Sequence, residues 1–159
     1  MSFETIIYGF IEGSTWKAES YRALQERNAQ ILSALPHEDT WPPLARGMFS
    51  FPSWSSLEGT HRAQVISIAA SMKNIELGDV GSWVTKLEAL LAQLYWLQAR
   101  VHLLTEVMGA YRLEYEVSSD VLSSYPTESP TPTRVWKRRV FRDHVELSDS
   151  EIRTWFVDA

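Results

Sequence analysis

The sequence predicts an α+β fold in which an open antiparallel or mixed sheet packs against helices. From Tyr111 to Val117, apolar and charged residues alternate one by one, which is the pattern of a half-buried strand. Before it, Val84 to Leu97 carries apolar residues at helical spacing, and so apolar a helix must pack against a sheet or another helix. With 159 residues, the chain is long enough to bury one core.

The N-terminal half is predicted to alternate strands and a helix. Its first segment is rich in Ile, Tyr and Phe, which favour strands. An amphipathic stripe with one polar position, Asn28, follows, and Pro36 ends it. The expected elements are a strand at 3–12, a helix from Trp16 to Leu35, a loop at 37–43, a short strand at 46–51 and a loop at 52–60.

The second half is predicted to add the main helix and the rest of the sheet. Ser82, or Asp79 before it, can cap the helix, and Ser148 with Glu151 has the capping-box spacing for a last short helix that ends near Phe156. The expected elements are a strand at 62–72, the helix, a strand at 101–107, a turn at 109–110, a strand at 111–117 and an edge strand within 134–147.

This order of elements predicts how the chain is organised. The first six elements match the split βαβ, ferredoxin-like order, with the two main helices on one face of the sheet. The stretch 118–133 holds five Ser, three Thr and three Pro, a composition typical of a mobile connection. We therefore expect a core domain at 1–118, a mobile connection at 119–133, and a C-terminal strand and short helix at 134–159 that pack on the same domain.

The charge of the chain is uneven. Its net charge is −5, but residues 134–142 hold five of the fifteen basic residues, and the remainder carries ten bases against twenty acids, a net charge of −10. An acidic body disfavours nonspecific nucleic-acid binding and favours a basic partner. No apolar stretch approaches the roughly 18 residues of a membrane span, and the N-terminus lacks the pattern of a signal peptide, so we expect a cytoplasmic protein with no membrane partner.

The residues of a catalytic or cofactor site do not form a recognisable motif. The chain has no Cys, its four His have no metal-ligand spacing, and glycine-rich phosphate loops and the serine nucleophile motif are absent. Glu114 and Glu116 share a strand face at about 7 Å. Two such carboxylates can serve acid–base chemistry or bind a cation, so a small enzyme or ligand site on the open sheet face is one alternative to a solvated face. We expect no enzyme activity, no metal and no cofactor.

The basic segment 134–142 has a further interpretation. Aromatic residues alternate there with Lys and Arg, a mixture that can bind a nucleic-acid backbone and stack a base. The segment could equally be an edge strand kept soluble by its charges, or pair with the acidic body of the same chain. A nucleic-acid-binding module is therefore kept as an alternative function, although the RNA-recognition strand signature is absent.

The opening of the chain resembles that of some bacterial immunity proteins encoded beside polymorphic toxins. The resemblance rests on residues 4–13, ETIIYGFIEG, followed by a helix, and extends in general style through the Trp83 helix and the strand 111–117, over roughly residues 1–118. It implies a small cytoplasmic protein that binds one cognate toxin and blocks it without catalysis. A basic toxin, such as a nuclease, would match the acidic body.

The candidate partner-binding residues follow from this interpretation. Aromatic residues in predicted loops beside acidic residues are typical interface anchors, and the acidic strand face could add to the same surface. These candidates are Glu38, Asp39, Trp41, Trp54, Glu58, Glu106, Glu114 and Glu116. The toxin, the binding surface and the oligomeric state are left open by the sequence.

Overall fold

The computed structural model describes residues 2–13, 18–51, 65–117 and 136–156. Seven strands form one sheet, and every neighbouring pair is antiparallel. The fold is therefore α+β, as predicted. The strands are β1 (Glu4–Glu12), β2 (Phe49–Ser50), β3 (Val65–Lys73), β4 (Gln98–Thr105), β5 (Gly109–Val117), β6 (Trp136–Arg142) and β7 (Val145–Glu146).

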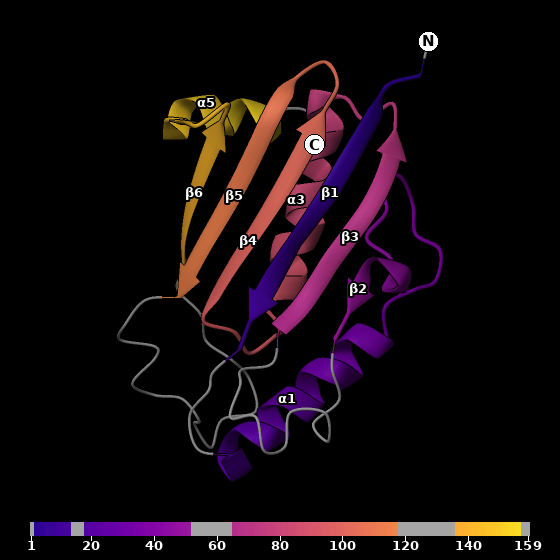
Figure 1. The fold of residues 1–159 in the computed structure, drawn as a ribbon, viewed down its shortest axis with the longest axis vertical. Coiled ribbons are helices and arrows are strands. Elements are labelled where there is room, and N and C mark those ends of the chain that lie inside the picture. The colour runs from indigo at the N-terminus through magenta and orange to yellow at the C-terminus, as the bar shows by residue number, and fades with distance from the viewer. Residues whose placement is uncertain (1, 14–17, 52–64, 118–135, 157–159) are drawn as a thin grey trace.

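The strand order in the sheet is β2-β3-β1-β4-β5-β6-β7 (Figure 1). β1 lies between β3 and β4, and it pairs with both along almost its whole length. β6 pairs with β5 over seven residues, so the C-terminal segment extends the same sheet. The two outermost strands have only two residues each, which limits the exposed edge that invites pairing with other chains.

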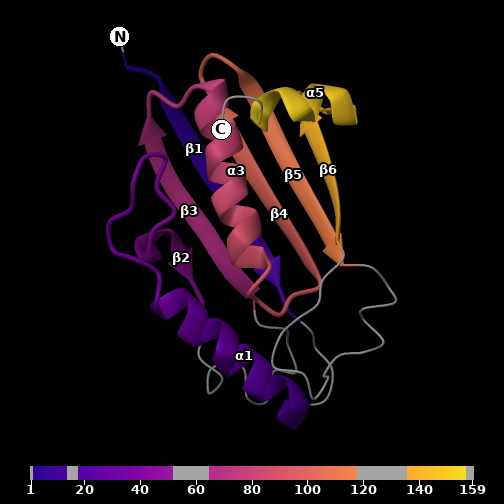
Figure 2. The same cartoon turned by 180° about the vertical axis from the view of Figure 1, so that it is seen from behind.

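The helices cover one side of this sheet. α3 (Leu77–Leu91) runs along the face seen in Figure 2, whereas α1 (Ala18–Ser33) lies obliquely at the end where β3 and β4 begin. The 3-10 turn η2 (Thr154–Phe156), which directly follows the short α5 (Asp149–Arg153), packs against α3. A second 3-10 turn, η1 (Arg46–Met48), precedes β2. The arrangement thus differs from the expected pair of helices side by side on the face, because only α3 follows the strands.

The strand sequences explain which face α3 covers. In β5, Tyr111, Leu113, Tyr115 and Val117 are buried and the residues between them are exposed or half-buried, as the alternation predicts. Ile7 and Ile11 of β1 and Val101 and Leu103 of β4 are fully buried on the same side. They meet the apolar stripe of α3, in which Trp83, Val84 and Leu87 are fully buried.

The single polar position in the stripe of α1 has a structural reason. The Asn28 side chain donates to the Tyr95 carbonyl at 2.8 Å and accepts from the Tyr95 amide at 2.7 Å. Both bonds are buried, and both backbone groups of Tyr95 are thereby satisfied. Asn28 therefore attaches α1 to the segment that leads into β4.

The C-terminal segment approaches α3 at a glycine. A β-carbon at Gly81 would lie 1.9 Å from the carbonyl oxygen of Trp155, so only glycine permits this contact. Trp155 is buried and makes an edge-on contact with Tyr111 at 5.2 Å between ring centres. The Ser148 and Glu151 capping box predicted from the sequence is present at the start of α5.

Several predicted boundaries were wrong. Residues 46–48 form η1, and only two residues of the expected 46–51 strand pair with β3. α3 begins at Leu77, because Glu76 occupies the cap and the Asp79 side chain accepts from its amide. The cap therefore lies three residues before Asp79 and six before Ser82, the two predicted caps. The expected strand within 134–147 is a hairpin that turns at Asp143 and His144, both with positive φ. The predicted loop at 52–60 and the predicted connection at 119–133 lie outside the described residues.

Candidate functional site

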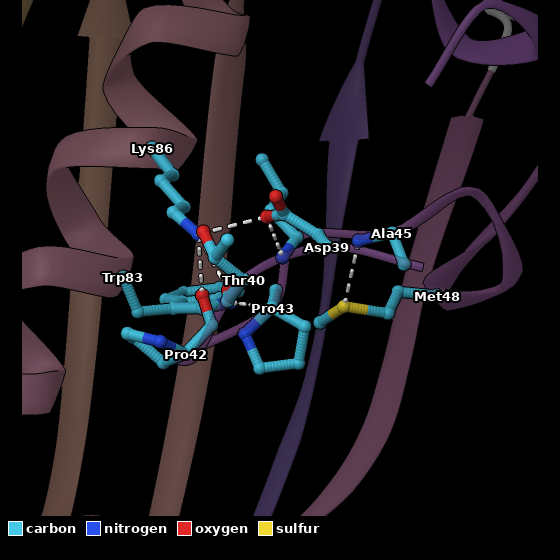
Figure 3. A network of polar contacts seen from close by, with 9 residues as sticks. Asp39, Thr40, Pro42, Pro43, Ala45, Met48, Trp83 and Lys86 are labelled. Carbon is cyan, nitrogen blue, oxygen red and sulfur yellow. Dashed lines mark hydrogen bonds and ion pairs between the residues drawn. The ribbon is translucent and has the colours of Figure 1, made fainter. Parts of the chain in front are cut away.

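The loop after α1 is held against α3 by one lysine, Lys86 (Figure 3). Its ammonium group contacts the Asp39 carboxylate at 2.8 Å and donates to the carbonyl oxygens of Thr40 at 2.8 Å and Pro42 at 2.9 Å. A lysine ammonium has three protons, so these three acceptors use them all. We call residues 37–44 the Trp41 loop, after its exposed aromatic residue.

The Asp39 carboxylate bonds both to the Trp41 loop itself and to α3. It accepts from the Leu44 amide at 3.0 Å as well as from Lys86. The bond from the Leu44 amide and the bond from Lys86 stabilise the charged form and lower the pKa of Asp39 from 3.8 to about 2. Asp39 is therefore ionised at neutral pH and joins both ends of the loop to α3.

Trp41 projects from this fixed loop. Its side chain is 53% exposed, whereas Trp83 of α3 is fully buried and donates to the Pro43 carbonyl at 3.1 Å. The peptide bond between Trp41 and Pro42 is cis. The loop that carries this exposed indole has little conformational freedom left to lose, because so many of its groups are fixed by contacts.

The second feature is the face of the sheet on the other side from α3. None of the helices in the described ranges lies on it (Figures 1 and 2). Four of the eight exposed large apolar side chains in the described chain belong to this face, which we call the open sheet face: Ile6 at 45%, Tyr8 at 43%, Val65 at 40% and Leu104 at 39%.

The centre of the open sheet face is aromatic. Tyr8 and His102 are partners in the β1–β4 register, and their rings stack in parallel with centres 4.6 Å apart. Phe10 follows two residues along β1, opposite Arg100. Partial burial, and then the charges of Arg100 and Arg112, lower the pKa of His102, which keeps its imidazole neutral at neutral pH.

One edge of the open sheet face is charged and internally paired. Glu114 lies 3.0 Å from Arg112, 3.4 Å from Arg100 and 4.0 Å from Arg139. Arg139 also makes a two-bond contact with Glu146 at 3.0 and 3.1 Å, which lowers the pKa of Glu146 and raises that of Arg139. The expected acidic row is therefore interleaved with guanidinium groups from three strands.

A shallow hollow lies beside these charges. Its volume is about 190 Å³, and its lining includes Phe10, Gln98, Arg100, Glu116 and Lys137. Polar groups make up most of its wall. In the described residues, no group of three or more His, Asp or Glu side chains is placed to hold a metal ion. No helix of the described chain is long and apolar enough to cross a membrane.

The structure separates the predicted partner-binding residues. Glu38 and Trp41 are exposed in the loop that Thr40 and Pro42 join to Lys86 of α3, while Glu114 and Glu116 lie on the open sheet face. The Asp39 carboxylate is occupied by the Leu44 amide of the loop and by Lys86 of α3.

Glu106 lies at the far end of the sheet from Glu114. It accepts from the Glu4 amide at 3.0 Å. Since Glu114 is opposite Arg100, six residues along β4 separate the two carboxylates, or about 20 Å. Trp54 and Glu58 lie outside the described residues.

The basic segment pairs with acids of the same chain. Arg138 contacts Glu88 of α3 at 2.7 Å, and Arg139 contacts Glu114 and Glu146. Phe141 lies under the guanidinium groups of Arg112 and Arg139, at 4.2 and 5.0 Å from the ring centre. Arg134 lies outside the described residues. These contacts favour the in-chain pairing that the sequence left open.

Two groups of functional candidates were missed by sequence reasoning. Lys86 gave no signal, because its partners come from a loop more than 40 residues earlier. The exposed apolar residues of β1, in contrast, did give a signal in the sequence. Residues 5–11, TIIYGFI, are apolar in both alternating positions, which is typical of a strand buried on both faces.

Comparison of the chain with protein-family models, with curated proteins and with solved structures finds no match.

Proposed function

We propose that this chain is a non-catalytic binding protein: an immunity protein that neutralises a cognate bacterial toxin domain in the cytoplasm. The observation that supports this most is Trp41, an exposed aromatic residue on a loop that Lys86 and Asp39 fix against α3. Tryptophan is enriched among the few residues that contribute most of an interface's binding energy. The resemblance of residues 4–13 to immunity proteins supports the same class.

The rigidity of the Trp41 loop is the physical basis of this proposal. A flexible loop loses conformational entropy when it binds, at about 0.5–1.5 kcal/mol for each immobilised long side chain. Here Lys86 joins Asp39, Thr40 and Pro42 before any partner arrives. The contacts of Trp41 with a partner would therefore contribute to affinity with little loss of conformational entropy in the loop.

The charge of the chain suggests the chemistry of the partner. The net charge is −5, and the exposed Glu38 lies within the Trp41 loop. A basic toxin domain would be steered toward such a surface, and its association rate would fall as salt is added.

The proposal also covers the type of fold to which the first four strands belong. We propose that the first four strands represent a split βαβ, ferredoxin-like unit to which β5, β6 and β7 were added. The sheet order β2-β3-β1-β4, with α1 and α3 in the connections after β1 and β3, supports this assignment.

The test is a binding measurement with the toxin domain that this proposal requires to be encoded beside the gene. The domain is identified by copurification with the chain from its native host and then titrated against wild type and Trp41→Ala. We expect at least about a 30-fold loss of affinity, the size of a hot-spot truncation. Val107→Ala is the control, because Val107 is 57% exposed on the turn between β4 and β5 and should leave the affinity unchanged. Equal loss in both variants, or none in Trp41→Ala, would refute the role of the loop.

A further inference from the structure

The open sheet face carries more apolar surface than a solvated face needs. In β1, Ile7 and Ile11 are fully buried under the helices, yet Ile6 and Tyr8 on the opposite side are also apolar and are 45% and 43% exposed. Strands that are apolar on both faces usually have both faces covered. Leu104 of β4 lies opposite Ile6 in the register, so these exposed side chains are contiguous.

The layout of this face is that of a protein interface. Ile6, Tyr8, Phe10, His102 and Leu104 form an apolar and aromatic centre on β1 and β4. Charged side chains surround this centre on β5 and β6 and at the ends of β1 and β3. A less polar centre within a polar rim is typical of interfaces between proteins.

The charges of the open sheet face cancel. The strand register places five basic and five acidic side chains on it, whereas the whole chain has a net charge of −5. Two copies of a balanced face do not repel one another, and such a face offers no selective attraction to a strongly basic partner. The basic residues are Lys73, Arg100, Arg112, Lys137 and Arg139, and the acidic ones are Glu4, Glu12, Glu114, Glu116 and Glu146.

The outward side chains also differ in size between the two sides of this face. On β3, the outward residues Ser67, Ala69 and Ser71 are small, so a low strip runs beside the larger side chains of β1. On the other side of the centre, β5 and β6 carry long side chains such as Arg112 and Arg139. A two-fold axis that lies between the two copies and runs parallel to β1 and β4 would place the long side chains of β5 and β6 in one copy over the small residues of β3 in the other.

We propose that the open sheet face is the interface of a symmetric homodimer, in which β1 and β4 of two copies face each other. Each copy presents the same patch, as a two-fold interface requires. The Trp41 loop is bonded to Lys86 of α3 through Thr40 and Pro42, and α3 covers the other face of the sheet, so the dimer leaves both Trp41 loops free. The homodimer is thus independent of the binding function proposed above.

The test is the mass of the full chain in solution, measured by light scattering on a size-exclusion column across the micromolar range. We expect twice the 18.2 kDa of one chain. Leu104→Glu places a charge in the centre and should shift the protein to the mass of one chain. Leu77→Glu is the matched control, because Leu77 is 38% exposed on α3 and Leu104 is 39% exposed on the sheet.

A wild-type chain that has the mass of one copy at every concentration would overturn the proposal, whether or not Leu104→Glu folds. A dimer that survives Leu104→Glu, with the circular dichroism of the wild type, would overturn the choice of face. Trp41→Ala should remain dimeric, so loss of toxin binding with an intact dimer separates the two proposals.

Discussion

The two faces of the sheet are built from the same strands but differ in what covers them. Leu103 of β4 is fully buried under α3, and its neighbour Leu104 is 39% exposed on the open sheet face. The covered face is closed within the chain by α3 and the C-terminal turn, whereas the open face keeps apolar side chains that no described element covers. The covered face therefore accounts for the stability of a single chain, and the open face is available for association.

The largest expected effect tests this division directly with two adjacent leucines. Leu103→Ala removes a fully buried side chain and should lower the free energy of unfolding by about 2–5 kcal/mol. Leu104→Ala should change it by no more than about 0.5–1 kcal/mol, since its side chain already contacts solvent. Urea denaturation is the measurement, at concentrations low enough for single chains. Equal losses would show that the open face is part of the core.

The next effect tests how closely the covered face is packed. Gly81→Ala brings a β-carbon to 1.9 Å from the Trp155 carbonyl oxygen, so the C-terminal turn must move away. We expect a loss of about 1–3 kcal/mol, as overpacking usually gives. Gly78→Ala in the same helix is the control, because its β-carbon would meet nothing within 4 Å, and it should be neutral or stabilising by up to about 1 kcal/mol. Thermal unfolding of the two variants and the wild type measures both changes in stability.

A pH-dependent effect tests the Trp41 loop on the covered side. The folded pKa of Asp39 is lowered to about 2, chiefly by the Leu44 amide and by Lys86, so its stabilisation is complete above about pH 4 and is lost as the pH falls through 2. The stability difference between wild type and Asp39→Asn should therefore shrink between pH 4 and pH 2. Denaturation of both proteins at several pH values measures it, and a difference independent of pH would contradict the assigned contacts.

The smallest expected effect lies at the edge of the sheet. The turn between β6 and β7 has Asp143 at φ 48° and His144 at φ 70°, a left-handed geometry that costs about 1 kcal/mol at a residue with a β-carbon. His144→Gly should raise the free energy of unfolding by roughly this amount. His144→Ala is the comparison that removes the imidazole but keeps the β-carbon. A gain that is the same in both variants would mean that the turn geometry is not its cause.

The sequence predicted the elements that repeat a simple pattern. Alternation identified β5, and helical spacing identified α3, because a single buried face determines each pattern. It predicted a short strand at 46–51 but not the bounds of β2 within it, since two paired residues are too few to show alternation. It also missed the turn at Asp143 and His144, because neither residue is a glycine. Positive φ is uncommon in any residue with a β-carbon, even though Asp and His adopt it more often than most.

The candidate site was predicted only where one residue carries the signal. Trp41 was expected from its loop and is exposed. The partner of Asp39 is Lys86, 47 positions along the chain, and the three arginines around Glu114 come from β4, β5 and β6. Such groupings depend on the order of strands and helices in space, which local sequence patterns do not encode.

The central claim is that the Trp41 loop binds and blocks a toxin. The most direct measurement is bacterial growth when the toxin domain encoded beside this gene is coexpressed with wild type or Trp41→Ala, with the amount of folded protein checked in each strain. The account predicts growth with the wild-type chain and growth arrest with Trp41→Ala. Full protection by Trp41→Ala, or arrest with the wild type, would contradict it.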